Sequence, residues 1–277
     1  MDTYLTTAID IAKEAGALLA QLFQRPHQIS YKSKFNLVTE ADRRSEAVII
    51  ERLRTHFPKH AVVAEEGGGQ KTASDYCWYV DPLDGTTNFA HGFPVFCVSL
   101  GLTYRDELIA GVVYDPTREE LFAAERKAGA YLNNQRIHVS KTTTLDESLL
   151  GTGFPVFATS DHRLNIQLYY RFTQICHGIR RAGSAALDLC SVAAGRFEGF
   201  WELKLNPWDK AAGALLVMEA GGRLSDLLDG EFSLQKDEIF ASNGLVHDAM
   251  GKVFAEVMKE TGERETEDRG QRTGDRE

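Results

Sequence analysis

Two aspartates that frame a proline stand out in VDPLDGTTNFAHGFP, residues 80 to 94. Asp81 and Asp84 lie three positions apart, and Pro82 between them has a fixed φ and donates no hydrogen bond. This arrangement can aim both carboxylates and the Leu83 carbonyl at one region, and magnesium prefers such oxygen ligands. The same residues also form an excellent turn, in which Asp84 would only cap a following helix. Local chemistry leaves both interpretations open.

The residues directly after this pair suit a phosphate group. If a helix begins there, the free backbone N–H groups of Gly85, Thr86 and Thr87 would receive phosphate oxygens. Two rival phosphate chemistries do not fit. A DxDGT motif of the haloacid-dehalogenase type needs an aspartate where Pro82 stands, and residues 65 to 71 lack the spacing of a P-loop. An activated water is therefore the expected nucleophile.

Further carboxylates stand in two other places, with Glu65 and Glu66 in AEEGGG and Asp209 in NPWDKAAG. Each place joins an apolar segment to a glycine turn or a helix start, where a rigid frame can hold a functional side chain. Two magnesium ions held by converging carboxylates can bind a phosphate ester and activate a water. Taken singly, Glu65 and Glu66 are typical of a solvated loop and Asp209 of a helix start.

The first half of the chain must position these groups with two helices and a sheet. Apolar residues at helical spacing predict a helix over residues 3 to 23. A second helix follows Thr39, a good N-cap, with Asp42 three residues later as its capping-box partner. From 77 to 133, runs of β-branched and aromatic residues separated by turns predict an antiparallel meander.

The later half alternates between helical and extended patterns. Helices are predicted over 184–196 and 207–222, and strands over 197–203, 223–227 and 238–243. We therefore expect helices layered on sheets in two halves. The first half, 1–145, carries most of the candidate ligands, and the second, 146–258, carries Asp209. A disordered tail is expected over 259–277. The tail has 12 charged residues and no apolar one.

Composition restricts the classes of function. The chain has 277 residues, 43% apolar and 26% charged, as expected for a soluble globular protein. No run approaches the roughly 20 apolar residues of a membrane span, and residues 1 to 16 lack the basic start of a secretory signal, so a cytoplasmic protein is expected. The net charge of −9 disfavours nucleic acid and anionic membranes as partners.

Several motifs in register resemble the inositol monophosphatase family, within the lithium-sensitive, magnesium-dependent phosphatases that include fructose-1,6-bisphosphatases. The motifs are LVTEAD (37–42), AEEG (64–67), DPLDGTTNF (81–89), and PWDKAAG (207–213) with EAGG (219–222). The resemblance covers about residue 5 to about residue 255. It implies an α/β (α+β layered) fold, an αβαβα sandwich that usually forms a homodimer.

The resemblance also implies a metal site with two or three Mg²⁺ ions. Glu65, Asp81 and the Leu83 carbonyl would hold one ion, and Asp81, Asp84 and Asp209 would hold a second. Glu65 would also contribute a ligand to a third, more weakly bound ion.

The resemblance also assigns residues that bind the phosphate and residues that orient the attacking water. Gly85 and Thr86 would bind the phosphate through their backbone N–H groups. Thr86, hydrogen-bonded to Asp42, would orient or deprotonate the water, next to the metal ligand Glu65.

Substrate specificity is implied by position as well. DGTTNF is the form typical of inositol monophosphatases, and Ser184, Ala185 and Glu202 fall where family members contact the inositol hydroxyls. A carboxylate such as Glu202 would accept hydrogen bonds from a polyol. Lys32 and Lys34 are both candidates for the lysine that the family often has near its LVT motif.

The leading hypothesis is hydrolysis of myo-inositol monophosphate, a small phosphate ester, by direct attack of water. One alternative is a broader sugar phosphatase that also acts on fructose 1,6-bisphosphate, because both enzymes would share the metal residues. Another is a regulatory protein that associates with the transcription machinery, with Arg180 and Arg181 among its contacts. The complete set of carboxylates favours an enzyme.

Overall fold

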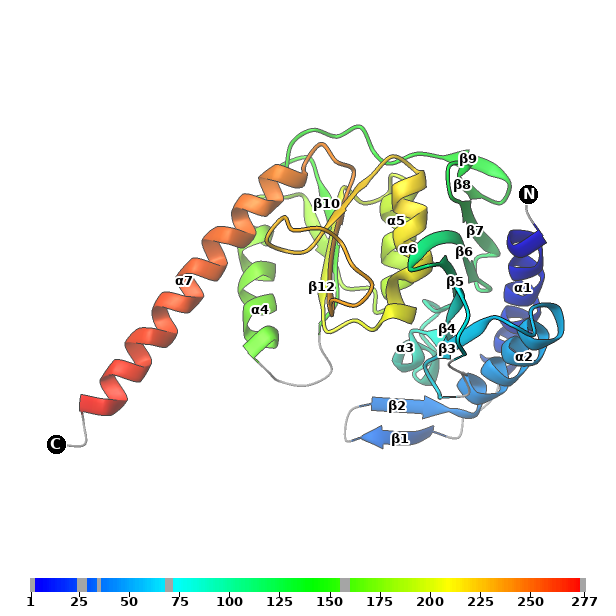
Figure 1. The fold of residues 1–277 in the computed structure, drawn as a ribbon. Coiled ribbons are helices and arrows are strands. Elements are labelled where there is room, and N and C mark those ends of the chain that lie inside the picture. Colours follow the sequence, from blue (N-terminus) through cyan, green and yellow to red (C-terminus); the bar gives the residue numbers. More distant parts are fainter. Residues whose placement is uncertain (1–2, 24–28, 34–35, 68–71, 155–159, 275–277) are drawn as a thin grey trace.

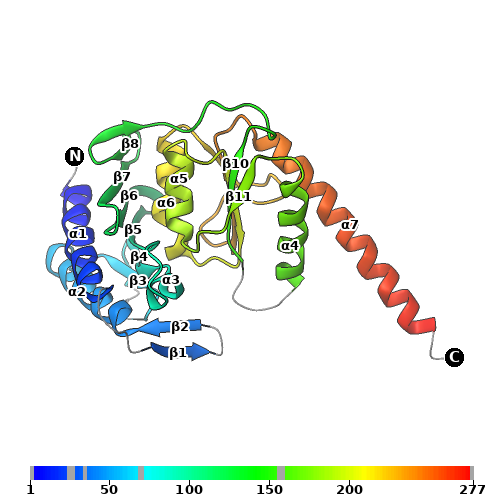
Figure 2. The same cartoon turned by 180° about the vertical axis from the view of Figure 1, so that it is seen from behind.

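Helices and sheets alternate in five layers (Figures 1 and 2). The computed structural model describes residues 3–23, 29–33, 36–67, 72–154 and 160–274. From one side to the other, the layers contain α1 with α2, a seven-stranded sheet, α5 with α6, a five-stranded sheet, and α4 with α7. The main helices are α1 (Thr3–Phe23), α2 (Glu40–His56), α4 (Ser160–Thr173), α5 (Ala185–Ala193), α6 (Pro207–Glu219) and α7 (His247–Gly274). The predicted αβαβα sandwich is confirmed.

The larger sheet follows the chain in order from β3 to β9. Neighbouring strands are antiparallel except β3, which runs parallel to β4, so the predicted meander is confirmed. Its strands are β3 (Ala61–Ala64), β4 (Tyr76–Asp84), β5 (Cys97–Tyr104), β6 (Glu107–Asp115), β7 (Glu120–Glu125), β8 (Gly129–Leu132) and β9 (Gln135–Ile137).

The smaller sheet has the strand order β11-β10-β12-β14-β13. Its first two pairs are parallel and the other two antiparallel. The strands are β10 (Leu149–Thr152), β11 (Gly178–Arg180), β12 (Gly199–Leu203), β13 (Arg223–Ser225) and β14 (Glu238–Ser242). Apart from both sheets, β1 (Ile29–Ser33) and β2 (Asn36–Thr39) form a hairpin, and the short helix α3 (Thr86–Ala90) follows β4.

Helix α6 packs directly on the backbone of the larger sheet, because two paired glycines leave room for it. Gly101 of β5 faces Gly111 of β6. A Cβ atom at Gly101 would lie 2.6 Å from the Cβ of Ala211, and one at Gly111 would lie 2.9 Å from the carbonyl oxygen of Ala212. This close approach brings the start of α6, and with it Asp209, to the strand that carries Asp81.

Helix α7 differs from what the sequence predicts for the end of the chain. Residues 259–277 are predicted to be disordered, whereas the backbone of α7 continues as helix to Gly274. The physical reason is that a helix anchored by buried residues such as Phe254 adds further residues without a new nucleation step. Glu, Lys and Arg, which are frequent here, are also good helix formers. The division into halves at 1–145 and 146–258 stays a prediction.

Candidate active site

The stretch DPLD is the irregular end of strand β4. Asp81 pairs with Ser99 and Asp84 with Cys97, and the register shifts between them at the proline. The Ser45 hydroxyl of α2 donates to the carbonyl oxygen of Pro82 at 2.7 Å, which holds the irregular strand against the helix. Asp81 is buried, and its Oδ1 accepts from the backbone N–H of Leu83 at 3.0 Å.

Asp84 reaches across the molecule to the start of helix α5. Its Oδ2 accepts from the Ser184 hydroxyl at 2.7 Å and from the backbone N–H of Ala186 at 2.8 Å. Ser184 is the N-cap of α5, and Ala185 is the first residue of that helix. The carboxylate therefore stabilises a helix start, as the turn interpretation suggested, but the helix is α5 and not the adjacent α3.

Gly85 makes the sharp step from β4 into α3. Its φ of 98° lies in the left-handed region, and a Cβ there would stand 2.7 Å from the carbonyl oxygen of Val95. The helix that the phosphate interpretation requires begins at Thr86. The first N–H groups of any helix have no acceptor within that helix, so they are suited to anionic oxygens.

Thr86 and Asp42 are in contact. The Thr86 hydroxyl donates to Asp42 Oδ1 at 2.8 Å and lies 3.1 Å from the carbonyl oxygen of Leu83. Asp42 Oδ2 accepts from the backbone N–H of Thr39 at 2.7 Å and from its hydroxyl at 2.6 Å, which confirms the predicted capping box. Asp42 is fully buried, so one carboxylate fixes both the start of α2 and the Thr86 hydroxyl.

The remaining carboxylates approach from β3 and α6. Glu65 follows β3, and its backbone N–H donates to the Val80 carbonyl beside Asp81 at 3.2 Å. Asp209 lies in the first turn of α6, where its Oδ2 accepts from the backbone N–H of Asn206 at 2.6 Å.

The charges of these carboxylates interact. Burial raises the pKa of Asp81 well above its ordinary value, and the charges of Glu65, Asp84 and Asp209 raise it further. Burial also raises the pKa of Asp209 to about 8, against the hydrogen bond from Asn206 and with further increases from Asp84 and Glu65. Burial raises the pKa of Asp84 too, although its hydrogen bonds from Ser184 and α5 oppose this.

An oxygen-only donor set with this mutual repulsion fits a hard divalent cation. A cation offsets the repulsion, and Mg²⁺ prefers carboxylate and carbonyl oxygens. Among the described residues, no three Asp, Glu, His or Cys side chains already surround one point in metal-binding geometry. Hydrogen bonds to Ser184, Ala186 and Asn206 direct two of the carboxylates instead. The set fits a metal by its chemistry, and not by a finished geometry.

Glu202 lies on β12 near the same cluster. Burial raises its pKa to about 8, with further increases from the charges of Asp84 and Asp209, and Arg181 opposes the shift. Gly153 makes room for it, because a Cβ at that position would overlap the Glu202 carboxylate.

Sequence reasoning missed several groups that shape this site. Ser45 supports Pro82, and its signal is available because it lies one helical turn after Asp42. Asn88 donates to the carbonyl oxygens of Val95 and Ala182, both at 2.8 Å, and so ties α3 to the segment before Ser184. Asp188 is buried, and burial followed by the charge of Glu202 raises its pKa well above the ordinary value. Asn88 stands within the DGTTNF motif, but the motif assigns it no role, and nothing in the local pattern distinguishes Asp188.

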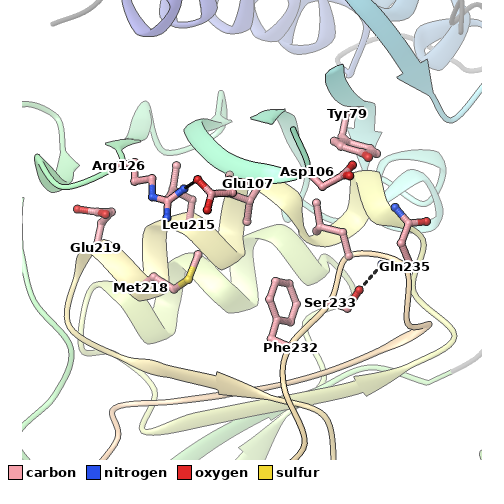
Figure 3. A pocket seen from close by; sticks show the side chains of 12 residues that line it. Tyr79, Asp106, Glu107, Arg126, Leu215, Met218, Glu219, Phe232, Ser233 and Gln235 are labelled. Atoms are coloured by element: carbon pink, nitrogen blue, oxygen red, sulfur yellow. Dashed lines mark hydrogen bonds and ion pairs between the residues drawn. The ribbon is translucent and has the colours of Figure 1, made fainter. Parts of the chain in front are cut away.

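A separate cavity of about 750 Å³ lies at the other end of α6 (Figure 3). Its walls are the turn at Asp106 and Glu107, the second half of α6, and residues 232–235. Glu107 forms an ion pair with Arg126 along one wall. The cavity is lined by none of the clustered carboxylates, which places it outside the candidate active site.

The five-layered sandwich holds, at the end of β4, the kind of oxygen-only donor set that a metal-dependent phosphatase needs. The chain belongs to the inositol monophosphatase family, whose family model matches residues 1–261. The resemblance found in the sequence motifs is therefore confirmed, and the family and fold imply a phosphatase that acts on small phosphate esters.

Relatives in this family have two kinds of name. The chain is 45% identical over 258 residues to the inositol-1-monophosphatase of Synechocystis, which spans 92% of this chain and 90% of that protein. It is also 45% identical over 250 residues to the Nus factor SuhB of Pseudomonas aeruginosa, across 88% of this chain and 92% of that protein. The solved inositol monophosphatase from Anabaena superposes with a TM-score of 0.83 at 40% identity, covering 92% of this chain and 96% of that one.

Proposed function

We propose that the protein hydrolyses myo-inositol monophosphate to inositol and phosphate, with Mg²⁺ as its cofactor. The observation that carries this proposal is that four carboxylates, one just after β3, two on β4 and one on α6, lie close enough for their charges to raise the pKa values of Asp81 and Asp209. The carboxylates are those of Glu65, Asp81, Asp84 and Asp209.

In this proposal the cluster holds two ions and, more loosely, a third. Glu65, Asp81 and the Leu83 carbonyl would hold one ion, Asp81, Asp84 and Asp209 a second, and Glu65 would contribute to the third. Bound Mg²⁺ would offset the charge of the phosphate oxygens, lower the pKa of a water and neutralise the leaving oxygen.

Thr86 and Asp42 would orient the attacking water. Because the Thr86 hydroxyl hydrogen points to Asp42 Oδ1, the lone pairs of the hydroxyl oxygen are left to accept a hydrogen bond from water. Thr39 fixes Asp42 by two short hydrogen bonds, so the direction of this hydroxyl is set before substrate arrives. The water would pass its proton to the Thr86 oxygen as the Thr86 hydroxyl proton moves to Asp42 Oδ1, and the leaving alkoxide would take a proton from a second water. Glu65 would act as a metal ligand.

Substrate would bind between the start of α3 and the start of α5. The backbone N–H groups of Gly85 and Thr86 would hold phosphate oxygens, and Ser184, Ala185 and Glu202 would border the alcohol. A partly buried carboxyl at Glu202 that finds no hydroxyl partner loses hydrogen bonds it would make in water. The site should therefore select an alcohol with a hydroxyl at that place.

The test compares kcat/KM for inositol 1-phosphate and fructose 1,6-bisphosphate with Mg²⁺. We expect a preference of at least about 10-fold for inositol 1-phosphate, and we expect Glu202→Gln to reduce that preference. Added Li⁺ should inhibit both reactions. Equal or higher kcat/KM on fructose 1,6-bisphosphate would instead establish the broader sugar phosphatase.

A regulatory role is the second candidate, and the relatives named Nus factor SuhB favour it. Arg180 and Arg181 are exposed and border a hollow of about 420 Å³, together with Phe93, which is 52% exposed. An exposed aromatic beside two cations suits a protein contact.

The homodimer implied by the family is also part of our proposal, and sedimentation velocity would test this oligomeric state.

No described helix is both long and apolar enough to cross a membrane. The cytoplasmic location stays a prediction. Lys34 lies outside the described residues, as does the side chain of Lys32, so their part in the site stays open.

A further inference from the structure

A lysine is buried directly beside one of the candidate metal ligands. Lys210 follows Asp209 in the first turn of α6 and is 0% exposed. Its ammonium group donates to the carbonyl oxygen of Lys236 and lies 3.4 Å from that of Glu238. A buried ammonium group is unfavourable unless it is hydrogen-bonded, so these two carbonyl oxygens help to keep it inside, together with the nearby charges of Asp209, Asp237 and Glu238.

The same segment, Lys236–Glu238, also holds the chain just before α6. The backbone N–H of Leu205 donates to the Asp237 carbonyl at 2.8 Å, and the Lys204 ammonium forms an ion pair with the Asp237 carboxylate at 2.6 Å. The segment therefore contacts both ends of the loop and helix turn that present Asp209. The two lysines differ in setting, because the Lys204 side chain is 46% exposed.

The start of α6 has different supports on its two sides. On one side, Ala211 and Ala212 rest on the larger sheet at Gly101 and Gly111. On the other side, the ammonium group of Lys210 reaches the segment that leads into β14. That segment directly follows residues 232–235. These residues line the cavity shown in Figure 3, so on that side they face the space of the cavity.

We propose that Lys210 is a positioning residue for the metal site, whose hydrogen bonds fix the first turn of α6 to the start of β14 and thereby hold Asp209 in place. The inference rests on the proposed function, because it takes Asp209 to be a metal ligand. A positive charge next to a cation site by itself repels the cation. The expected benefit of Lys210 is therefore its position, and the two effects predict opposite changes in metal affinity.

The test replaces Lys210 by methionine, which keeps most of the length and apolar stem but loses the ammonium group. The matched control is Lys204→Met, which removes the exposed lysine from the same segment. Mn²⁺ binding to the substrate-free protein is measured by electron paramagnetic resonance, and Mg²⁺ dependence of turnover at saturating substrate gives a second readout. We expect Lys210→Met to weaken Mn²⁺ binding by about 10-fold, as changes to the groups that support metal ligands do. Lys204→Met should leave Mn²⁺ affinity unchanged, since exposed ion pairs contribute little.

Conservative replacement separates position from general stability. The side chain in Lys210→Gln carries an N–H donor but is one bond shorter, so it can keep only part of the hydrogen bonding to these carbonyl oxygens, and its Mn²⁺ affinity should lie between those of the wild type and Lys210→Met. Tighter Mn²⁺ binding in Lys210→Met would show that charge repulsion dominates, and unchanged affinity with a lower Tm would show a structural role alone. Either result overturns the proposal. If Lys210→Met does not fold, the folded Lys210→Gln provides the test. Weakened Mn²⁺ binding by Lys210→Gln would then support the proposal, and unchanged binding would overturn it. A wild-type protein that binds no Mn²⁺ and releases no phosphate would instead refute the proposed function itself.

Discussion

Replacing Asp84 by asparagine should lower kcat for phosphate release by at least about 100-fold while the fold is retained. The asparagine carbonyl oxygen can still accept from Ser184 and Ala186, because these hydrogen bonds need an acceptor and no charge. The amide group then faces the other carboxylates with a donor where a metal ion requires an oxygen ligand. Asp209→Asn should behave alike, because its carbonyl oxygen can still accept from Asn206.

The control for both variants is Asp75→Asn, which removes a carboxylate from an exposed ion pair with Arg105. Its turnover should equal that of the wild type. Circular dichroism and Tm establish that each variant is folded before kcat is compared. Near-normal turnover in both Asp84→Asn and Asp209→Asn would remove the assignment of these carboxylates to the metal site.

Replacing Thr86 by valine should lower kcat by about 100-fold, within the range for loss of a group that positions or accepts a proton. Valine keeps the branched shape of threonine but cannot bond to Asp42 or to water. The Mg²⁺ concentration for half-maximal activity should stay close to that of the wild type, because the carboxylates are untouched. This split between turnover and metal dependence distinguishes Thr86 from a metal ligand.

Two further variants check the role of the hydroxyl. Thr86→Ser keeps the hydroxyl and should recover most of the activity. Thr87→Val changes the exposed neighbour and should have no effect. If Thr86→Val retained wild-type kcat, the water that attacks phosphorus would have to be oriented by other groups.

Local signals in the sequence were enough to locate much of the fold. The capping pair Thr39 and Asp42 located the start of α2, and the change from helical to alternating periodicity located the meander from β4 to β8. Helix α4 was missed although Leu164, Leu168 and Phe172 lie four residues apart on one face. The short strands β10 and β11 have three or four residues each, which is too few for a period to show.

Two kinds of signal pointed to the candidate site, the spacing of neighbouring residues and the family motifs. The proline between Asp81 and Asp84 indicated a shared direction for both carboxylates, and the family motifs added Glu65 and Asp209. Asp84 and Ser184 are 100 residues apart, so their hydrogen bond depends on how α5 packs against β4. The contact between Lys210 and Lys236 depends in the same way on the packing of α6 against the start of β14.

The central claim is that the carboxylates at the end of β4 make this protein a magnesium-dependent phosphatase. The most direct measurement is phosphate release from inositol 1-phosphate by purified, chelator-treated protein as Mg²⁺ is added back. We predict no release without the metal and saturable release as Mg²⁺ rises. A well-folded protein that releases no phosphate at any Mg²⁺ concentration, while still binding components of the transcription machinery, would contradict this account and establish the regulatory role.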